Sequence, residues 1–386
     1  MEKRKQTGFF FQVEREKIVD VHPYLDYAFY RSIEELVETQ TLEESLNLVC
    51  KACRTSPFSQ QLCFVQGIET LARIEVPLRA KFIRTIVSEL ERISEHLFWL
   101  GVIGYEVGLS SLQSHISNDQ QLILKLVKTL FDLQEGWCKI NVIGGAQHDI
   151  IDTPIIVDKI SKRLDMIEDQ LSSYEDLILE EKNIGVRFKE VSVLDTKMAK
   201  SLGAVGPLAR ASGLQMDVRK NDTYAAFETI DFELVSFNYG DVLARILVIL
   251  QEAYESIHIV RTALRNLPKG EIRTPHPEWM GPGEQLSRTE ASQGELLNYL
   301  RITSNKLERL KVRPPALANL ASLLEILKNS YIADIPVVIA SVDPSFFYTD
   351  LIILKESTGN KYGYSREELR NYGICWYKSK KQLGSI

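Results

Sequence analysis

The chain has 386 residues, of which 45% are hydrophobic and 25% are charged, a composition that allows a globular protein to bury a sizeable core. Its net charge of −6 gives no reason to expect the clustered cationic surface that phosphate binding needs, so we expect no nucleic-acid partner. The sequence contains no uninterrupted apolar stretch of about 18 to 20 residues, the length of a membrane-spanning helix, and its charged N-terminus does not have the pattern of a secretory signal.

The first predicted elements are two short strands near the N-terminus. Phe9–Val13 and Lys17–Val21 are rich in β-prone residues and are separated by a charged turn, which predicts a β-hairpin over about residues 8–22. From about residue 25 to residue 330 the apolar residues recur mainly at helical spacing. This part of the chain should form a helical core.

Prolines and glycines indicate where the helices of this core begin and end. Pro77 is placed to open a helix and Gly101 to close it, and the apolar residues between them predict one buried face. Further helices are predicted over about residues 112–135, 154–182, 242–267 and 315–328. Ile335–Ser341 is a compact β-branched run, which predicts a buried strand. We therefore expect a mainly α fold, a central helical bundle with small peripheral β elements.

The five cysteines, an odd number, are more typical of a reducing compartment than of a disulfide scaffold. Cys50 and Cys53 form a CxxC pair, whose thiols could bind a metal together or act as a redox pair. The other three, Cys63, Cys138 and Cys375, are isolated and have no paired histidines, which disfavours a structural zinc site. The helical surroundings disfavour a thioredoxin-like motif, and an inert, reduced pair remains an alternative.

Several segments, in the same order, resemble the large subunits of membrane-bound NiFe hydrogenases and their counterpart in respiratory complex I. The resemblance is carried by Phe64–Gly101, Gly206–Gly213, Gly240–Arg245 and Ser341–Pro344. It covers about residues 8–350, and it implies a hydrogenase large-subunit-like domain over residues 1–350, with the predicted strand and a former ligand loop over residues 335–350. Residues 351–386 are then a C-terminal extension, most simply a docking or solvated one.

Three charged or polar residues of the Phe64–Gly101 segment fall on the family pattern and on one side of the predicted helix. They are Glu89, Arg92 and His96, spaced three and four residues apart. We expect them to form a structural hydrogen-bond network rather than to take part in catalysis.

The resemblance also shows where this chain departs from NiFe hydrogenases. In those enzymes two CxxC motifs supply four thiolates to the nickel–iron centre, but here Ser345 and Tyr348 stand at the second pair of positions. Hydroxyl groups are poor substitutes for soft bridging thiolates, so we predict no metal and no other cofactor bound by this chain alone. A motif arginine of the family is replaced by Gln293, and the family's Gly-Pro-x-His-Pro cavity loop is not found before Phe9.

A family Arg-Gly-x-Glu motif is represented by the segment from Arg31 to Glu34. The resemblance makes Glu34 a candidate proton relay, because burial of a glutamate raises its pKa toward the working range of a proton donor. The alternative is an ordinary surface helix start with a salt bridge.

Membrane-bound sulfane reductases resemble energy-converting hydrogenases whose large subunit has lost the nickel site, and the chain departs from the family in the same way. We therefore predict the peripheral large subunit of an ion-translocating oxidoreductase complex on the cytoplasmic face of the cell membrane. Its expected partners are a small iron–sulfur subunit that supplies electrons, other hydrophilic subunits and membrane ion-translocating subunits.

The predicted reaction is reduction of a sulfane or polysulfide substrate by the thiols of Cys50 and Cys53, with Arg31 holding the anionic substrate and Glu34 relaying protons. The alternatives are a quinone-reducing, complex I-like subunit, against which the missing cavity loop argues, and an inert scaffold subunit. A cavity lined by Arg31 and Glu34 would favour chemistry, whereas one filled by the aromatic residues at 347 and 348 would favour the scaffold.

Overall fold

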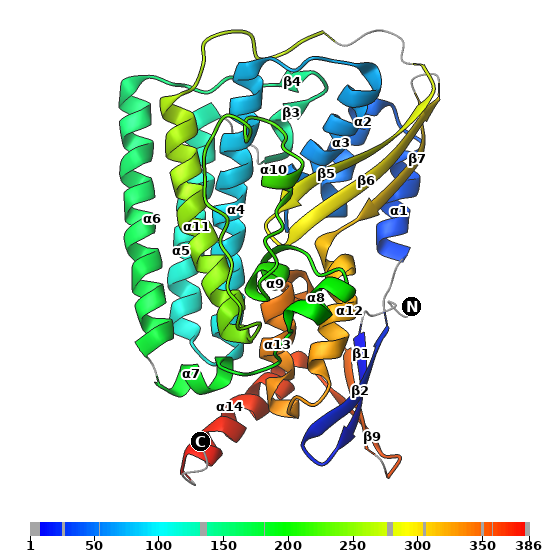
Figure 1. Ribbon diagram of the computed structural model, residues 1–386, viewed down its shortest axis with the longest axis vertical. Coiled ribbons are helices and arrows are strands. Elements are labelled where there is room, and N and C mark those ends of the chain that lie inside the picture. The colour runs from blue at the N-terminus through cyan, green and yellow to red at the C-terminus, as the bar shows by residue number, and fades with distance from the viewer. Residues whose placement is uncertain are drawn as a thin grey trace.

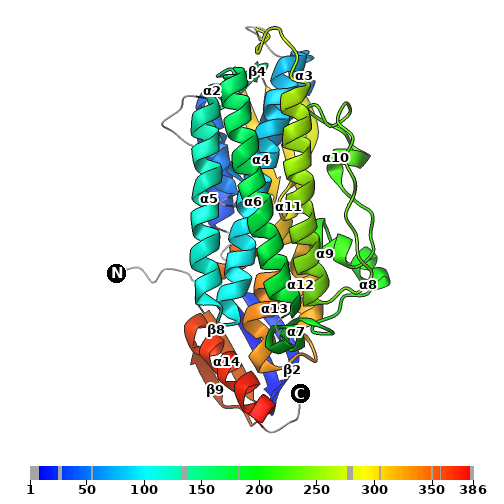
Figure 2. The same cartoon turned by 90° about the vertical axis from the view of Figure 1, so that its left-hand side faces the viewer.

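Four long helices form the centre of the computed structural model and run side by side along its long axis (Figures 1 and 2). They are α4 (Leu78–Glu106), α5 (Ser110–Phe131), α6 (Pro154–Glu180) and α11 (Val242–Arg265). The structure describes residues 8–24, 28–53, 55–131, 137–180, 182–275, 281–303, 306–348, 351–356 and 358–382. The predicted mainly helical fold is confirmed, and no helix among the described residues combines the length and apolar character needed to cross a bilayer.

The central helix α4 is buried on most of its surface and is longer than predicted. The prediction that it ends at Gly101 is wrong, because the helix continues through Gly104 to Glu106. A Cβ atom at Gly101 would lie 3.3 Å from the Ile116 side chain, and one at Gly104 would lie 3.0 Å from the Leu112 side chain. The two glycines therefore let α5 pack closely against α4. The helix ends before Gly108, whose φ of +92° a glycine adopts readily.

The helices predicted from residues 154, 242 and 315 are confirmed, the last as α12 (Pro315–Leu327). The expected end of the helix over about residues 112–135 lies partly outside the described residues, since α5 is described to Phe131. The shorter helices are α1 (Ala28–Val37), α2 (Leu42–Val49), α3 (Pro57–Ala72), α7 (Lys182–Phe188), α8 (Thr196–Ser201), α9 (Gly206–Ala211) and α10 (Val218–Asn221).

The N-terminal hairpin is confirmed as β1 (Gly8–Glu14) and β2 (Lys17–Tyr24), and it belongs to a larger sheet. β8 (Leu351–Glu356) pairs in parallel with β1, and β9 (Lys361–Tyr364) completes the order β2-β1-β8-β9. Helix α14 (Arg366–Gln382) then packs at the same end of the molecule and buries Leu369 (Figure 1). The described part of residues 351–386, predicted to be a docking or solvated extension, thus packs onto the rest of the chain.

A three-stranded antiparallel sheet lies within the range predicted to be helical, and this prediction is corrected. It consists of β5 (Gly283–Ala291), β6 (Gly294–Thr303) and β7 (Lys306–Arg313), and it packs on α3. Buried and partly exposed residues alternate along β6, which is the period of a strand with one buried face. A two-residue turn, Ser292–Gln293, joins β5 to β6.

The strand predicted over Ile335–Ser341 is also wrong, because these residues form helix α13 (Ile335–Val342). All eight residues of α13 are buried. A helix that is buried on every side has no polar face, so its apolar run is indistinguishable by period from a buried strand. The remaining elements are β3 (Asn141–Val142), β4 (Gly145–Ala146) and the short 3₁₀ turns η1 (Cys50–Ala52), η2 (Trp137–Lys139), η3 (Ile332–Asp334) and η4 (Pro344–Tyr348).

The start of α9 packs directly onto the β5–β6 turn. Gly206 has a φ of +65°, and a Cβ atom there would lie 2.2 Å from the carbonyl oxygen of Gln293. We expect Gly206→Ala to destabilise the chain by more than the about 1 kcal/mol that a left-handed alanine costs by itself, because the turn must also move. Gly203→Ala is the control, since Gly203 has a φ of +66° with open space around it. Equal shifts of the two variants' urea midpoints would show that the close contact is unimportant.

Candidate functional site

The CxxC pair lies where α2 leads into α3. A capping box formed by Thr41 and Glu44 opens α2, and Cys50 begins the short turn η1 that follows it. The Cys50 thiol donates a hydrogen bond to the Asn47 carbonyl oxygen, 3.3 Å away. The chain becomes extended at Cys53, so the two thiols lie in different surroundings.

Both cysteines are buried, and Cys53 has the apolar surroundings. It packs in an apolar cluster with Cys63, Ala291 and Leu296, and its sulfur lies 3.8 Å from the Thr55 hydroxyl oxygen. Burial raises the pKa of the Cys53 thiol to about 12. Near neutral pH this thiol keeps its proton, which makes it a poor nucleophile.

Cys50 has the opposite character. Its pKa is lowered, mainly by a hydrogen bond with the thiol of Cys138, a residue of η2 far away in the sequence. The same contact, together with burial, raises the pKa of Cys138. Cys50 is therefore the more acidic thiol, and the group that lowers its pKa belongs to a cysteine that looks isolated in the sequence.

The former second ligand motif approaches the same region. The backbone N–H of Ser345 donates to a carboxylate oxygen of Asp343 at 2.7 Å, which folds the loop into a tight turn. The charge of Asp343 adds to the effect of burial in raising the pKa of the Cys53 thiol. Tyr348 lies in η4, but its side chain is outside the described part of the chain. A serine hydroxyl does not fit the place of a bridging thiolate, so this set of donors does not fit a nickel–iron centre.

The β5–β6 turn closes this region from a third side. The Ser56 hydroxyl donates to the side-chain oxygen of Gln293 at 3.1 Å and lies 3.5 Å from the Ser292 hydroxyl. Gln293 stands where the resemblance places an arginine, and its buried amide nitrogen has no hydrogen-bond partner. The turn therefore presents a neutral donor instead of a cation.

Buried carboxyl groups line the α4 side of the region. Glu91 accepts hydrogen bonds from the backbone N–H groups of Phe58 and Ser59, at 2.7 and 2.9 Å, and from the Ser59 hydroxyl. Burial nevertheless raises the pKa of Glu91 to about 7, and it raises the pKa of Asp343 to about 6. Burial and the nearby charges of Glu91 and Asp343 also raise the pKa of Glu95, one helical turn further along α4. Glu91 and Asp343 can therefore exchange protons near neutral pH.

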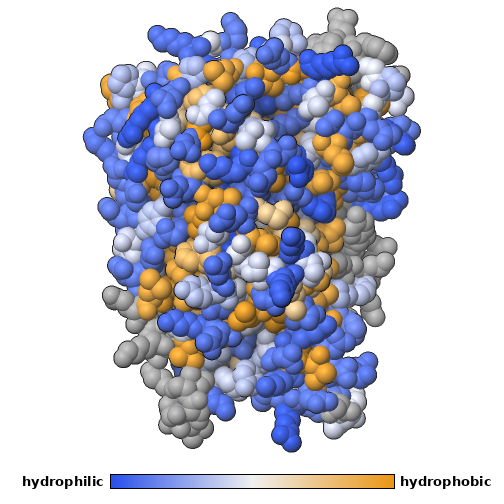
Figure 3. Space-filling view, in the orientation of Figure 1, coloured by the Kyte–Doolittle hydropathy of each residue, from blue (hydrophilic) through white to orange (hydrophobic). Residues whose placement is uncertain are grey.

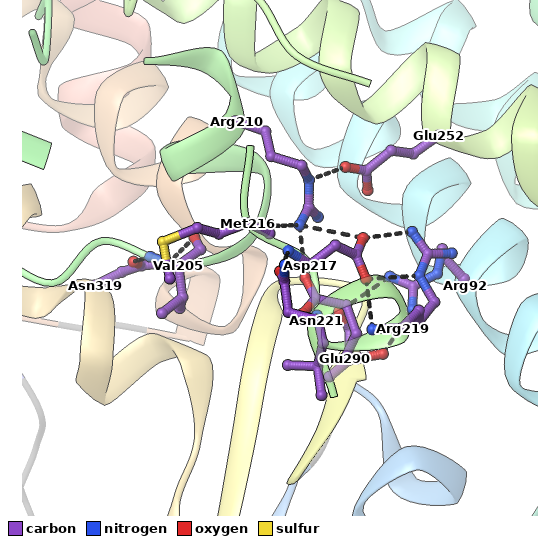
Figure 4. Close-up of polar contacts among 12 residues, drawn as sticks. Arg92, Val205, Arg210, Met216, Asp217, Arg219, Asn221, Glu252, Glu290 and Asn319 are labelled. Carbon is purple, nitrogen blue, oxygen red and sulfur yellow. Dashed lines mark hydrogen bonds and ion pairs between the residues drawn. The ribbon is translucent and has the colours of Figure 1, made fainter. Parts of the chain in front are cut away.

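A larger network of buried charges connects α4, α9, α10, α11 and β5 (Figure 4). Arg210 on α9 donates to Glu252 at 2.5 Å, to Glu290 at 2.7 Å and to the Met216 carbonyl oxygen at 2.9 Å. Its guanidinium also lies 3.4 Å from the Asp217 carboxylate. One arginine thus joins α9, α11 and β5.

Arg219 joins the next part of the network. It pairs with both carboxylate oxygens of Asp217, at 3.0 and 2.7 Å, and with Glu89, which also accepts from the Ser256 hydroxyl at 2.6 Å. Arg92 lies 3.3 Å from Glu89 and donates to the backbone carbonyl groups of residues 290 and 291. The network therefore fixes the β5–β6 turn against α4.

This network contains three guanidinium groups and four carboxyl groups: Arg92, Arg210, Arg219, Glu89, Asp217, Glu252 and Glu290. Three positive and four negative charges leave one excess negative charge unless one carboxyl group binds a proton. Burial and the charge of Asp217 raise the pKa of Glu290 to about 7, whereas Arg210 overcomes the effect of burial and lowers the pKa of Glu252 to about 2. Glu290 therefore binds a proton more readily than Glu252 does.

His96 joins the network through Glu252, whose carboxylate lies 3.1 Å from Nε2. Burial lowers the pKa of His96, so the ring is neutral near neutral pH. Glu89, Arg92 and His96 thus all contact the charge network, and the residues on α9, α10 and β5 that complete it were not identified from the sequence as partners.

The sequence motif of Arg31 and Glu34 does not bring their side chains to the thiols, because both side chains bind other residues. The Arg31 side chain is 53% exposed and pairs with Glu35 on the same helix at 2.8 Å. Glu34 is buried, and it accepts hydrogen bonds from Lys311 at 2.5 Å and from the backbone N–H of Val312 at 3.0 Å, both on β7. These contacts tie α1 to the sheet, and they give no support to a role in substrate binding or proton relay.

Comparisons with known proteins agree with this architecture. The profile of a family described as "Respiratory-chain NADH dehydrogenase, 49 Kd subunit" matches residues 137–285 and 279–350. The chain is 32% identical over 339 residues to an NADH-quinone oxidoreductase subunit of Dehalococcoides mccartyi, covering 86% of this chain and 90% of that one. It is 30% identical over 389 residues to membrane-bound hydrogenase subunit alpha of Pyrococcus furiosus, covering 95% and 88%.

A solved structure also resembles the chain over most of its length. It is described as the membrane-bound sulfane sulfur reductase, an archaeal respiratory membrane complex, and it aligns with a TM-score of 0.80 at 25% identity, covering 86% of this chain and 91% of that one. No group of three or more His, Cys, Asp or Glu side chains that could hold a metal ion occurs in the described ranges.

Proposed function

Because the chain belongs to the family of the 49 kDa subunit of respiratory-chain NADH dehydrogenase, we propose that it is the large subunit of a membrane-associated complex that reduces sulfane sulfur. Its relatives are subunits of multi-subunit membrane complexes, and a sulfane sulfur reductase is among its structural neighbours. The attacking group in this proposal is the Cys50 thiol. In this proposal the chain lies on the cytoplasmic face of the membrane, an adjacent iron–sulfur subunit supplies the electrons, and membrane subunits couple the reaction to ion translocation.

The proposal rests on the different pKa values of the two CxxC thiols. A metal ion bound by the pair would need both as thiolates, but the pKa of Cys53 is raised by burial whereas that of Cys50 is lowered. A thiolate attacks a sulfane sulfur atom readily and leaves the chemistry independent of a metal in this chain. Ser345, at the place of the lost thiolate, supports the same conclusion.

Protons for the reduced sulfur can come from the carboxyl groups on α4. Glu91 lies close enough for its charge to act on the thiols of Cys50, Cys53 and Cys138. Its pKa of about 7 suits a group that gives and regains a proton in each cycle. This assigns to Glu91 the relay function that the sequence had suggested for Glu34.

A partner surface is available on the face shown in Figure 3, where apolar patches alternate with polar ones. The segment between α7 and α11 lies on this face in Figures 1 and 2. It exposes three large apolar side chains, Val193, Met216 and Tyr239, of which Tyr239 is 71% exposed. This surface is a candidate for contact with a neighbouring hydrophilic subunit.

We expect Cys50→Ser to reduce the rate of polysulfide reduction by the purified intact complex at least 100-fold, because a serine hydroxyl is not ionised near neutral pH. Sulfide release is the measurement, and Cys375→Ser, a change of an exposed cysteine on α14, should leave the rate unchanged. Full activity in the Cys50→Ser complex would refute the proposal.

The same preparation tests quinone reduction, which the similarity to an NADH-quinone oxidoreductase favours as a second candidate. Quinone turnover that persists in Cys50→Ser, without sulfide production by the unchanged complex, would select the quinone function. An intact complex that turns over neither substrate would favour a scaffold role for this chain.

A further inference from the structure

A pocket of about 370 Å³ opens beside Cys138, between the end of α2, α3 and the loop that leads into β3. Cys138 lines it and is partly exposed, unlike Cys50 and Cys53, which are buried. Asn47, the residue whose carbonyl oxygen accepts from the Cys50 thiol, also lines it. The pocket is therefore lined by Cys138 itself and by Asn47, the residue that the Cys50 thiol contacts.

A side-chain bridge holds the segments that carry Cys50 and Cys138 together. The buried side-chain nitrogen of Gln61 on α3 donates to the carbonyl oxygen of Leu46 at 2.9 Å and to that of Cys138 at 3.0 Å. Leu46 lies one turn before Cys50 on α2, so Gln61 ties the segments that carry the two cysteines. The proximity of these two segments is therefore built into the packing of α2, α3 and η2.

The pocket lining is suited to a small polar or anionic ligand. Asn141 is 2% exposed, and neither its amide nitrogen nor its amide oxygen has a hydrogen-bond partner. The side-chain oxygen of Gln61 is also buried and unpaired. Lys139, His148 and Arg273 contribute basic side chains to the same lining. Buried polar atoms without partners are costly unless a bound molecule satisfies them.

We propose that Cys50 and Cys138, rather than Cys50 and Cys53, form the reactive dithiol of this chain, and that the pocket beside Cys138 admits the sulfane-sulfur substrate. This inference rests on the proposed function for its substrate, but the dithiol itself is a separate claim. Cys53 is then a core residue of the CxxC segment.

The reaction balances with a substrate R–S–S–R′ as the oxidant. The Cys50 thiolate attacks one sulfur, which forms a Cys50–S–S–R mixed disulfide and releases R′–S⁻. The Cys138 thiol then attacks the Cys50 sulfur, which forms a Cys50–Cys138 disulfide and releases R–SH, the proton moving from Cys138 to the leaving sulfur. The substrate gains two electrons and the two cysteines lose two. Two electrons and one proton from the complex restore the Cys50 thiolate and the Cys138 thiol, and a second proton converts R′–S⁻ to R′–SH.

The dithiol is tested by oxidising the intact complex with diamide, blocking free thiols with N-ethylmaleimide and identifying linked peptides by mass spectrometry without reduction. We expect a Cys50–Cys138 link, formed equally in Cys53→Ser and absent in Cys138→Ser. A Cys50–Cys53 link, or two freely alkylated thiols at 50 and 138, would overturn the assignment. The Cys50–Cys138 link in a complex that releases no sulfide would refute the proposed function and leave the dithiol standing.

Turnover with polysulfide tests the order of the two thiols. We expect Cys138→Ser to stop after about one equivalent of sulfide and to retain substrate sulfur on Cys50, whereas Cys53→Ser should keep at least half of the rate. Steady turnover by Cys138→Ser would show that another group completes the reaction.

The pocket is tested by Asn141→Leu, which removes both unpaired polar atoms at similar volume. We expect KM for polysulfide to rise at least fivefold while the diamide-induced link forms normally. An unchanged KM would place the substrate elsewhere.

Discussion

Replacement of Arg210 by methionine is expected to lower the free energy of unfolding of this chain by about 3–5 kcal/mol, the usual cost of removing one partner from a buried ion pair. The methionine fills much of the arginine's space but leaves Glu252, Glu290 and Asp217 facing one another without their shared cation. Mutual repulsion then adds to the cost of burying each charge. Pulse proteolysis of the complex in urea, followed on the band of this chain, measures the change.

The matched control is Arg301→Met. The Arg301 side chain is 42% exposed and pairs with Glu308 on the neighbouring strand, so this change should cost at most about 1 kcal/mol. The Arg210→Met variant should also recover part of its stability at lower pH, because Glu290 and its neighbours can bind protons when the cation is gone. Equal midpoints for the two variants would contradict the view that Arg210 neutralises a buried cluster.

The sequence predicts long helices with a start signal better than short segments that are buried on all sides. α4, α6 and α11 have proline or aspartate start signals and recurring apolar spacing, and they begin where expected. α13 has neither a polar face nor a length that separates helix from strand. The alternation along β6 was visible in the sequence, but it lay inside a range assigned to the helical core.

Partners far apart in the sequence were the harder part of the site. A CxxC pair suggests that its own thiols act together, yet the pKa of Cys50 is lowered mainly by Cys138, whose segment the packing of α2 against η2 brings near. Glu91 does not belong to a recognised motif, unlike its neighbours Glu89 and Arg92. Its pKa is raised by burial, and α3 covers it. Arg31 and Glu34 matched a motif, but motif position alone does not determine whether a side chain faces a cavity.

Stability should fall as the pH rises from about 5 to about 8, chiefly through Glu91. Its pKa is about 7 in the folded chain and about 4.5 when unfolded, so the folded state binds more protons in this window. The stabilisation is complete below about pH 4.5 and is lost as the pH passes through 7, a change of about 3 kcal/mol at most. Asp343 and Glu290, with pKa values raised to about 6 and about 7, act in the same direction.

Glu91→Gln separates this contribution from the others. The amide cannot ionise, so the urea midpoint should depend less steeply on pH between 5 and 8, although the variant loses some stability at every pH because an amide nitrogen faces the donors of Phe58 and Ser59. The neutral, buried His96 has a lowered pKa and opposes the trend, since its contribution is lost as the pH falls. Glu308→Gln, at an exposed position on β7, is the control and should keep the slope of the unchanged chain. An identical slope in Glu91→Gln would mean that Glu91 is already ionised at pH 5, and its three hydrogen bonds would then outweigh its burial.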